Sequence, residues 1–186
     1  MMKQVLKFSF PLMAILILSA CGNNINPENK TATEHHHDHT AMEHTQAASP
    51  ASPLLKNDRL NAVYQHYNHL TVALTNGNIA DAKIAANAIE AGAKFVDGAS
   101  GIIASAEKIM IARDIETQRR LYSGMSKAMA TLIKKEGMSG GELYIAFCPM
   151  ALNDQGATWV SENKEIRNPY FGEKMLACGE VKETIR

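Results

Sequence analysis

Apolar side chains recur at spacings of three and four between residues 60 and 133, and this period limits the fold more than any other feature of the sequence. Such spacing places the apolar residues on one face of an α-helix. Asp114 has the position of a helix N-cap, and Gly77 and Gly137 follow apolar runs as helix-ending residues do. The sequence therefore predicts an all-α fold, a small bundle of about four helices, over residues 60–74, 79–96, 102–110 and 115–136.

The helical spacing stops beyond Gly140. Residues 143–147 form a short apolar run that can be extended, and turn-forming residues cluster at 153–156 and 168–172. We expect this irregular, partly extended C-terminal segment to wrap around the bundle, held by Trp159, Tyr170 and Phe171. Loops on a rigid scaffold often carry function, so this third of the chain is where we expect the site.

The first twenty residues have the pattern of an export signal. Two lysines precede an apolar run over residues 8–18, which is shorter than the roughly 20 residues of a membrane-spanning helix. The run ends in LSAC at residues 18–21, which resembles the lipobox of bacterial lipoproteins, where the cysteine, here Cys21, is acylated and becomes the first mature residue. An ordinary secretory peptide cleaved nearby is the alternative.

The residue after Cys21 is Gly22, not the aspartate that retains many such lipoproteins in the inner membrane. The resemblance therefore implies a protein of the cell envelope, attached to the outer membrane by a lipid anchor and facing the periplasm.

Composition divides the chain into three parts. Residues 1–20 are the expected signal peptide. Residues 21–53 are His-rich and hold almost nothing apolar to bury, as in a disordered tether. Residues 54–186 have the usual size of a single domain with its own core. Acidic and basic side chains number nineteen each, and no basic patch indicates a nucleic-acid partner.

Four sulfur-bearing side chains of the domain lie in two short segments. Cys148 and Met150 flank a proline, and Met175 stands three positions before Cys178. Thiolates and thioethers are soft ligands that select Cu(I) over hard cations, and one ion can join both segments if they meet in the fold. A bound metal displaces the thiol protons. The sequence thus predicts a candidate Cu(I) site in a metal-handling domain over residues 54–186.

The same residues allow a simpler interpretation. In an oxidising compartment two cysteines usually pair. A Cys148–Cys178 disulfide would close a loop of about 31 residues and contribute roughly 3 to 4 kcal/mol in the chain-entropy model. Methionine is most often a core residue. The residues alone leave the disulfide and the metal site open, and the two states can alternate with redox conditions.

Several segments of the domain together resemble one uncharacterised family. They are DIETQR at residues 114–119, YIAFCPMA at 144–151, GATWVS at 156–161, EIRNPYFG at 165–172 and MLACG at 175–179. They look like a periplasmic domain of unknown function that occurs in free lipoproteins and fused to the periplasmic adaptor subunits of Cus-type copper and silver efflux pumps. The resemblance covers about 130 residues, and its CPM, NPYFG and MxxCG elements are specific.

The resemblance implies copper handling and a heavy-metal efflux adaptor or pump as a partner. Carried over by position, the proposed ligands are Cys148, Met150, Met175 and Cys178. The sequence departs from the family at Phe147, where tyrosine is common, and at Val160, where leucine is common. Neither departure touches the sulfur set.

The tether holds a second candidate metal site. Clustered imidazoles bind Cu(II), Zn(II) or Ni(II), but a flexible segment loses entropy when it is ordered, so we expect moderate affinity and poor selectivity. A His-rich spacer without metal function is the alternative. The residues concerned are His35, His36, His37, His39 and His44, with Asp38 and Met42 among them.

Two further pairs of side chains are weaker candidates for metal ligands. His66 and His69 are three positions apart on the first expected helix and can in principle share an ion, although most such histidines are surface residues. Met125 and Met129 lie in the apolar stripe of the fourth expected helix, which favours core packing over ligation.

These patterns predict a non-enzymatic protein that binds Cu(I) for sequestration or for relay to an efflux system. The alternative is a protein-interaction module stabilised by a Cys148–Cys178 disulfide. A cysteine nucleophile needs a base and an orienting group. The domain's histidines are far from both cysteines in sequence, and no GxSxG, HExxH or phosphate-loop motif is present.

Overall fold

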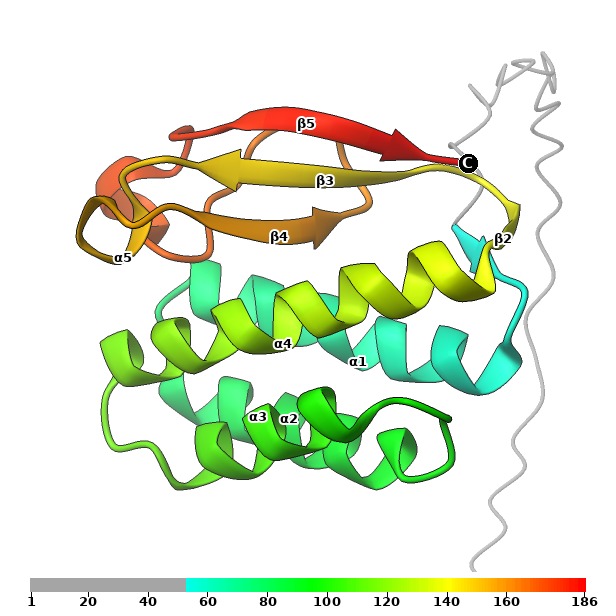
Figure 1. Cartoon of the computed structure of the whole chain (residues 1–186). Helices are drawn as coiled ribbons and strands as arrows, with labels where there is room; N and C mark the ends of the chain where they lie inside the picture. The colour runs from blue at the N-terminus through cyan, green and yellow to red at the C-terminus, as the bar shows by residue number, and fades with distance from the viewer. Residues whose placement is uncertain (1–52) are drawn as a thin grey trace, which may run out of the picture. The chain divides into compact units, whose positions relative to one another are not determined.

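The computed structural model describes residues 53–186 (Figure 1). The predictions for the signal peptide, for lipidation at Cys21 and for the tether histidines fall outside this range. None of the helices in residues 53–186 has the length and apolar content needed to cross a bilayer.

Four long helices form a bundle, as predicted. They are α1 (Asp58–Thr75), α2 (Ile79–Ala93), α3 (Ser100–Ile111) and α4 (Ile115–Glu136). The Asp114 carboxylate caps α4 by accepting a hydrogen bond from the Thr117 amide at 2.7 Å. Gly137, at φ 79°, ends the same helix. The largest difference is at the end of α2, which stops at Ala93 and not near Val96, and the other ends agree within two residues.

The helices pack through one continuous hydrophobic core. α2 contributes mainly alanines to its buried face, and these small side chains let α1 approach closely. A Cβ built on Gly92 would lie 3.0 Å from a methyl group of Val63, so the two backbones are near their closest possible distance there. Met125 and Met129 of α4 are fully buried, which confirms the prediction of core packing for this pair.

The all-α prediction is wrong, because the domain also contains two antiparallel sheets. A small one pairs β1 (Leu54–Leu55) with β2 (Met138–Gly140). The larger sheet has the order β4-β3-β5 and consists of β3 (Leu143–Cys148), β4 (Ala157–Ser161) and β5 (Glu180–Ile185). The extended run predicted at 143–147 is the central strand of this sheet, and the segments expected to wrap the bundle supply its two neighbours.

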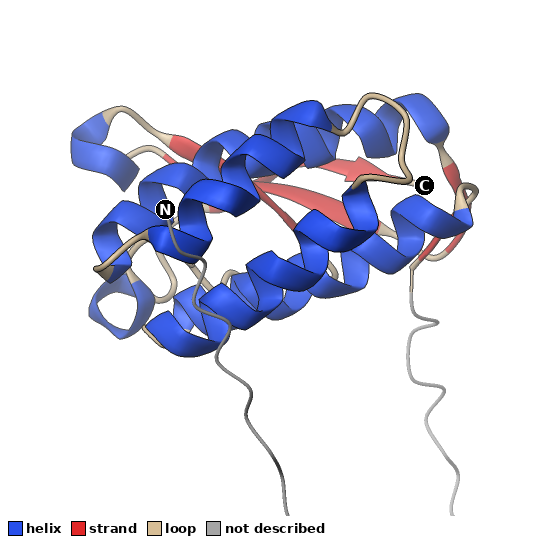
Figure 2. Cartoon of the chain, turned by 90° about the horizontal axis from the view of Figure 1, so that it is seen from below, coloured by secondary structure: helices blue, strands red, loops and turns tan. Residues whose placement is uncertain are grey.

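The larger sheet covers α1 and α4, and α2 and α3 form a second helical layer on the side away from the sheet (Figures 1 and 2). Trp159 and Val160 of β4 and Leu143 of β3 are buried in the core. A hydrogen bond ties the layers together, since the Val160 amide donates to the Tyr67 hydroxyl at 3.0 Å.

Two short elements connect the strands. α5 (Ala151–Asp154) follows β3, and the 3-10 helix η1 (Gly172–Met175) precedes β5. Trp159 and Tyr170 are buried as predicted, while Phe171 is partly exposed. The two connections lie at the same end of the sheet and carry the sulfur residues (Figure 1).

Candidate functional site

The sheet register brings the two cysteines together. Cys148 is the last residue of β3, and Phe147 just before it pairs with Glu180 at the start of β5. Because β3 and β5 are antiparallel, the residues after Phe147 lie beside the residues before Glu180. The Cys148 and Cys178 sulfurs are 2.6 Å apart, and both cysteines are free in the described part of the chain. The predicted convergence of the two segments is therefore present for the thiols.

The two thiols differ in their surroundings. Cys148 is fully buried beneath the end of the sheet, whereas Cys178 is partly exposed. A hydrogen bond with Cys148, together with desolvation, raises the pKa of the Cys178 thiol to about 11. At neutral pH this thiol keeps its proton until a metal ion or an oxidant removes it.

The predicted thioether ligands lie in the two segments that carry the cysteines. Met150 follows Cys148 and Pro149 at the N-terminal end of α5, and its side chain is 47% exposed. Met175 is the last residue of η1 and is partly buried, and its carbonyl accepts a hydrogen bond from the Cys178 amide at 3.1 Å. Their participation as ligands stays a prediction.

The chain makes an unusually tight turn after Cys148. Leu152, Asn153 and Asp154 have φ values of 56°, 58° and 61°, in the left-handed region that costs an L-residue roughly 1–2 kcal/mol each. Gly156 continues the turn at φ 74°, and a Cβ there would lie 2.8 Å from the Phe147 ring. Sequence reasoning predicted a turn here but not a run of left-handed residues.

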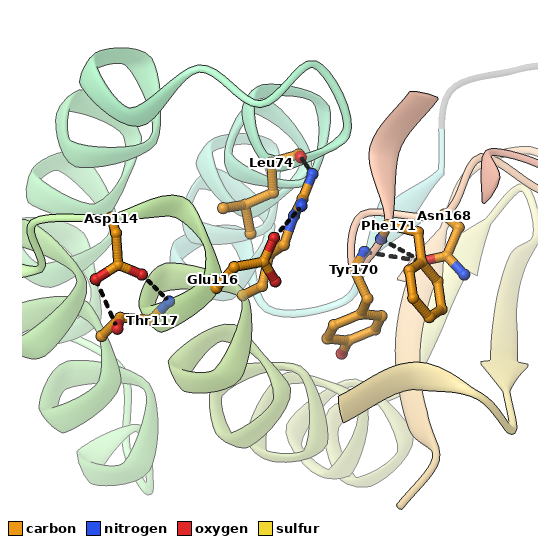
Figure 3. Close-up of polar contacts among 8 residues, drawn as sticks. Leu74, Asp114, Glu116, Thr117, Asn168, Tyr170 and Phe171 are labelled. Atoms are coloured by element: carbon orange, nitrogen blue, oxygen red, sulfur yellow. Dashed lines mark hydrogen bonds and ion pairs between the residues drawn. The ribbon is translucent and has the colours of Figure 1, made fainter. Parts of the chain in front are cut away.

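Asn168 organises the other side of the site, and its role was missed at the level of sequence. The side chain is fully buried, and its Oδ1 accepts hydrogen bonds from the amides of Tyr170 at 2.8 Å and Phe171 at 3.3 Å (Figure 3). Its Nδ2 donates to the Cys178 carbonyl at 2.8 Å. Turn propensity alone identifies this asparagine as a loop residue and gives no sign of the second contact.

Arg119 lies against the same turn and links α4 to the end of α1. The Arg119 guanidinium is buried, donates to the Leu74 carbonyl at the end of α1 at 2.9 Å and pairs with Glu116 at 3.0 Å (Figure 3). Gly172 packs against this arrangement at φ 59°. The DIETQR and NPYFG segments, far apart in sequence, therefore meet in one structural unit beside the thiol pair.

Buried tyrosines form a hydrogen-bonded group between the helices and β4. The Tyr122 hydroxyl donates to the Tyr67 hydroxyl at 2.7 Å, Thr71 contacts Tyr122 at 2.7 Å, and Ser126 lies within hydrogen-bonding distance of Tyr67. Burial raises the pKa of both tyrosines above the usual value. These phenols stay protonated and serve the packing of α1 on α4.

The histidine pair lies far from the thiols in the sequence and in a different setting. His66 is partly buried and His69 exposed, as predicted, with ring centroids 6.1 Å apart. They line a groove of about 480 Å³ between α1 and α2, which Ile84 and Asp81 also line. Among residues 53–186, no three His, Cys, Asp or Glu side chains are grouped so that they could hold a metal ion.

Residues 63–141 match the model of a family described as "Protein of unknown function (DUF3347)". The match agrees with the resemblance to an uncharacterised domain family, and it covers the helices from Val63 of α1 through β2. It ends before β3, so Cys148 and Cys178 lie outside it. No curated protein and no solved structure matches the chain.

Proposed function

We propose that this protein binds a soft closed-shell metal ion, with Cu(I) as the natural ion, through the thiolates of Cys148 and Cys178. The observation that carries the proposal is the 2.6 Å separation of the two sulfurs, which come from segments thirty positions apart. Soft sulfur donors select Cu(I), and binding replaces both thiol protons.

A modest opening of the pair accommodates the ion. Two sulfurs bound to one ion at about 2.3 Å each, at a trigonal angle, stand about 4 Å apart. The sulfurs must therefore separate by more than an ångström. Cys178 lies in a connecting segment and is partly exposed, whereas Cys148 belongs to the central strand, so Cys178 is the residue that moves.

The thioethers complete the proposed ligand set. Cu(I) accepts two to four sulfurs, so Met150 or Met175 suffices as a third ligand. The exposure of the Met150 side chain leaves it free to rotate toward an arriving ion without loss of core packing.

The N-terminal features support a proposal for the cellular role. We propose a lipid-anchored envelope protein, attached through Cys21 and facing the periplasm, that sequesters Cu(I) or relays it to a heavy-metal efflux adaptor or pump. The supports are the lipobox resemblance, the family resemblance and the tether histidines, which would collect Cu(II) or Zn(II) with lower selectivity.

A second candidate function is an interaction module with a Cys148–Cys178 disulfide. The same 2.6 Å separation favours it, because a small approach of the sulfurs suffices once an envelope thiol oxidant accepts the two electrons and the two thiol protons are lost. The partner would be another envelope protein, and the disulfide would stabilise the sheet end without any metal.

A thiol count and a Cu(I) titration separate the two functions. The full chain with Cys21→Ser leaves two cysteines, which are counted before and after reductant. The reduced protein is then titrated with Cu(I) against bicinchoninate. Metal binding predicts one tightly held Cu(I), lost in Cys178→Ser and weakened in Met150→Leu or Met175→Leu, which keep side-chain volume.

The tether supplies a matched control. Alanine at all five tether histidines, in the same chain, should leave the tight Cu(I) equivalent unchanged. Loss of the tight equivalent in that variant, or its retention in Cys178→Ser, would reject the thiol site. An absence of free thiols before reduction, with no tight Cu(I) afterwards, would favour the interaction module.

A further inference from the structure

The position of Cys178 needs a structural explanation that Cys148 does not. Cys148 ends a central strand that is hydrogen-bonded on both sides, with Ala157 as its partner in β4. Cys178 lies between η1 and β5, outside any helix or strand. Its own local contact is the bond from its amide to the Met175 carbonyl. The distance between the sulfurs therefore depends on what fixes the segment around Cys178.

Asn168 makes the contacts that fix this segment. Its backbone amide donates to the Leu176 carbonyl at 2.8 Å, and its side-chain Nδ2 donates to the Cys178 carbonyl at 2.8 Å. One residue thus binds two carbonyls of a three-residue stretch. The Asn168 side chain is fully buried, so water does not compete for these bonds.

Asn168 is itself held by the turn that it organises. Its Oδ1 accepts from Tyr170 and Phe171, and its carbonyl accepts from the Gly172 amide at 3.0 Å. The Tyr170 hydroxyl anchors the turn to β4 by donating to the Thr158 carbonyl at 2.6 Å. The Tyr170 bond adds to the stability of the turn, whereas the hydrogen bonds from this turn to the Cys178 segment are those of Asn168.

The chemistry at position 168 requires an amide. The side chain must accept from two backbone amides and at the same time donate to a carbonyl, which asparagine does with its oxygen and nitrogen. An ionised aspartate has acceptors only. A serine can still accept within the turn but is too short to reach the Cys178 carbonyl.

We propose that Asn168 is the positioning residue of the thiol pair: its Nδ2 holds Cys178 opposite Cys148 and so sets how readily the two sulfurs act together. The inference rests on the proposed function only where Cu(I) is concerned, because closure of the disulfide reports the same geometry without metal.

The test compares Asn168→Asp and Asn168→Ser with Tyr170→Phe in the full chain carrying Cys21→Ser. Tyr170→Phe removes a hydrogen bond from the same turn without touching Cys178, so it is the control for lost stability. The first readout is the effective concentration of the pair, from its thiol–disulfide equilibrium with glutathione. The others are Cu(I) affinity and the unfolding midpoint.

We expect both Asn168 variants to lower the effective concentration about tenfold, the effect of losing one buried hydrogen bond. Tyr170→Phe should lower the unfolding midpoint and leave the effective concentration within about twofold of the unmutated value. A neutral carboxyl group has a hydrogen-bond donor. The effective concentration measured for Asn168→Asp should therefore approach that of the unmutated protein as the pH falls and the introduced carboxyl is protonated.

Three results would overturn the proposal. One is an unchanged effective concentration in both Asn168 variants. The second is a loss of effective concentration in Tyr170→Phe equal to that in the Asn168 variants. The third is loss of cooperative unfolding in both Asn168 variants. The second and third results would mean that Asn168 only stabilises the fold. Failure of the proposed function is seen separately, as absence of tight Cu(I) in the protein with Asn168 intact.

Discussion

Replacing Gly172 by alanine tests whether the turn beside the thiols is fixed by close backbone contact. Gly172 has φ 59°, and a Cβ there would lie 2.6 Å from the Thr75 carbonyl oxygen and 2.7 Å from an Arg119 nitrogen. Alanine in the left-handed region costs about 1 kcal/mol, and crowding in a well-packed site costs about 1–3 kcal/mol. We expect Gly172→Ala to lower the free energy of unfolding by about 3 kcal/mol in total.

Gly77→Ala is the matched control, since Gly77 has a similar φ of 69° and no described atom lies within 4 Å of its would-be Cβ. This variant should lose only the backbone part, about 1 kcal/mol. Both are measured by urea unfolding under reducing conditions, followed by fluorescence of the buried Trp159. Equal losses in the two variants would refute the steric argument.

Four further variants probe the fold. Hydrogen bonds from the Thr117 amide and hydroxyl lower the pKa of the Asp114 carboxyl, so the ionised cap stabilises the fold at pH values above its ordinary pKa of 3.8. The difference in urea midpoint between the unmutated protein and Asp114→Ala should vanish as the pH falls through the lowered pKa, below 3.8. Tyr67→Phe should cost about 1–3 kcal/mol in thermal or urea unfolding because it leaves buried partners unpaired. Tyr64→Phe should cost nothing, since the Tyr64 hydroxyl has no partner within residues 53–186, and an equal cost would contradict both assignments. Met125→Ala should lower the free energy of unfolding by about 2–5 kcal/mol in the same measurement, and a loss below about 1 kcal/mol would argue against full burial of Met125.

The helices were predictable because their signals are local. Apolar residues repeat within each turn, and Asp114 and Gly137 mark the ends of α4 through contacts with residues three or four positions away. The surrounding chain cannot easily reverse such a pattern, so the number of bundle helices was predicted correctly and their bounds nearly so.

The larger sheet was missed in part because β5, one of its two edge strands, lacks an apolar signature. β5 reads EVKETI, and its charged residues are exposed along the free edge that the described chain leaves uncovered. Charge at an edge prevents pairing with other chains, and it also removes the alternation that would identify a strand. β3 was recognised as extended because it is central and buried.

The site was predictable only in its sulfur atoms. Their residue types indicated soft-metal or disulfide chemistry, but their distance depends on the pairing of Phe147 with Glu180, which no local pattern encodes. The role of Asn168 depends on a carbonyl ten positions later, in a segment without periodicity. Long-range contacts between irregular segments could not be predicted from the sequence.

The unequal burial of the two sulfurs has a kinetic consequence. A chelator or partner protein that collides with the domain meets Cys178 and cannot touch Cys148, whose sulfur is covered by the sheet end. In the proposed metal complex, ligand exchange at the two thiols would then be stepwise and in a fixed order, with Cys178 engaged before Cys148 on arrival and released after it on departure.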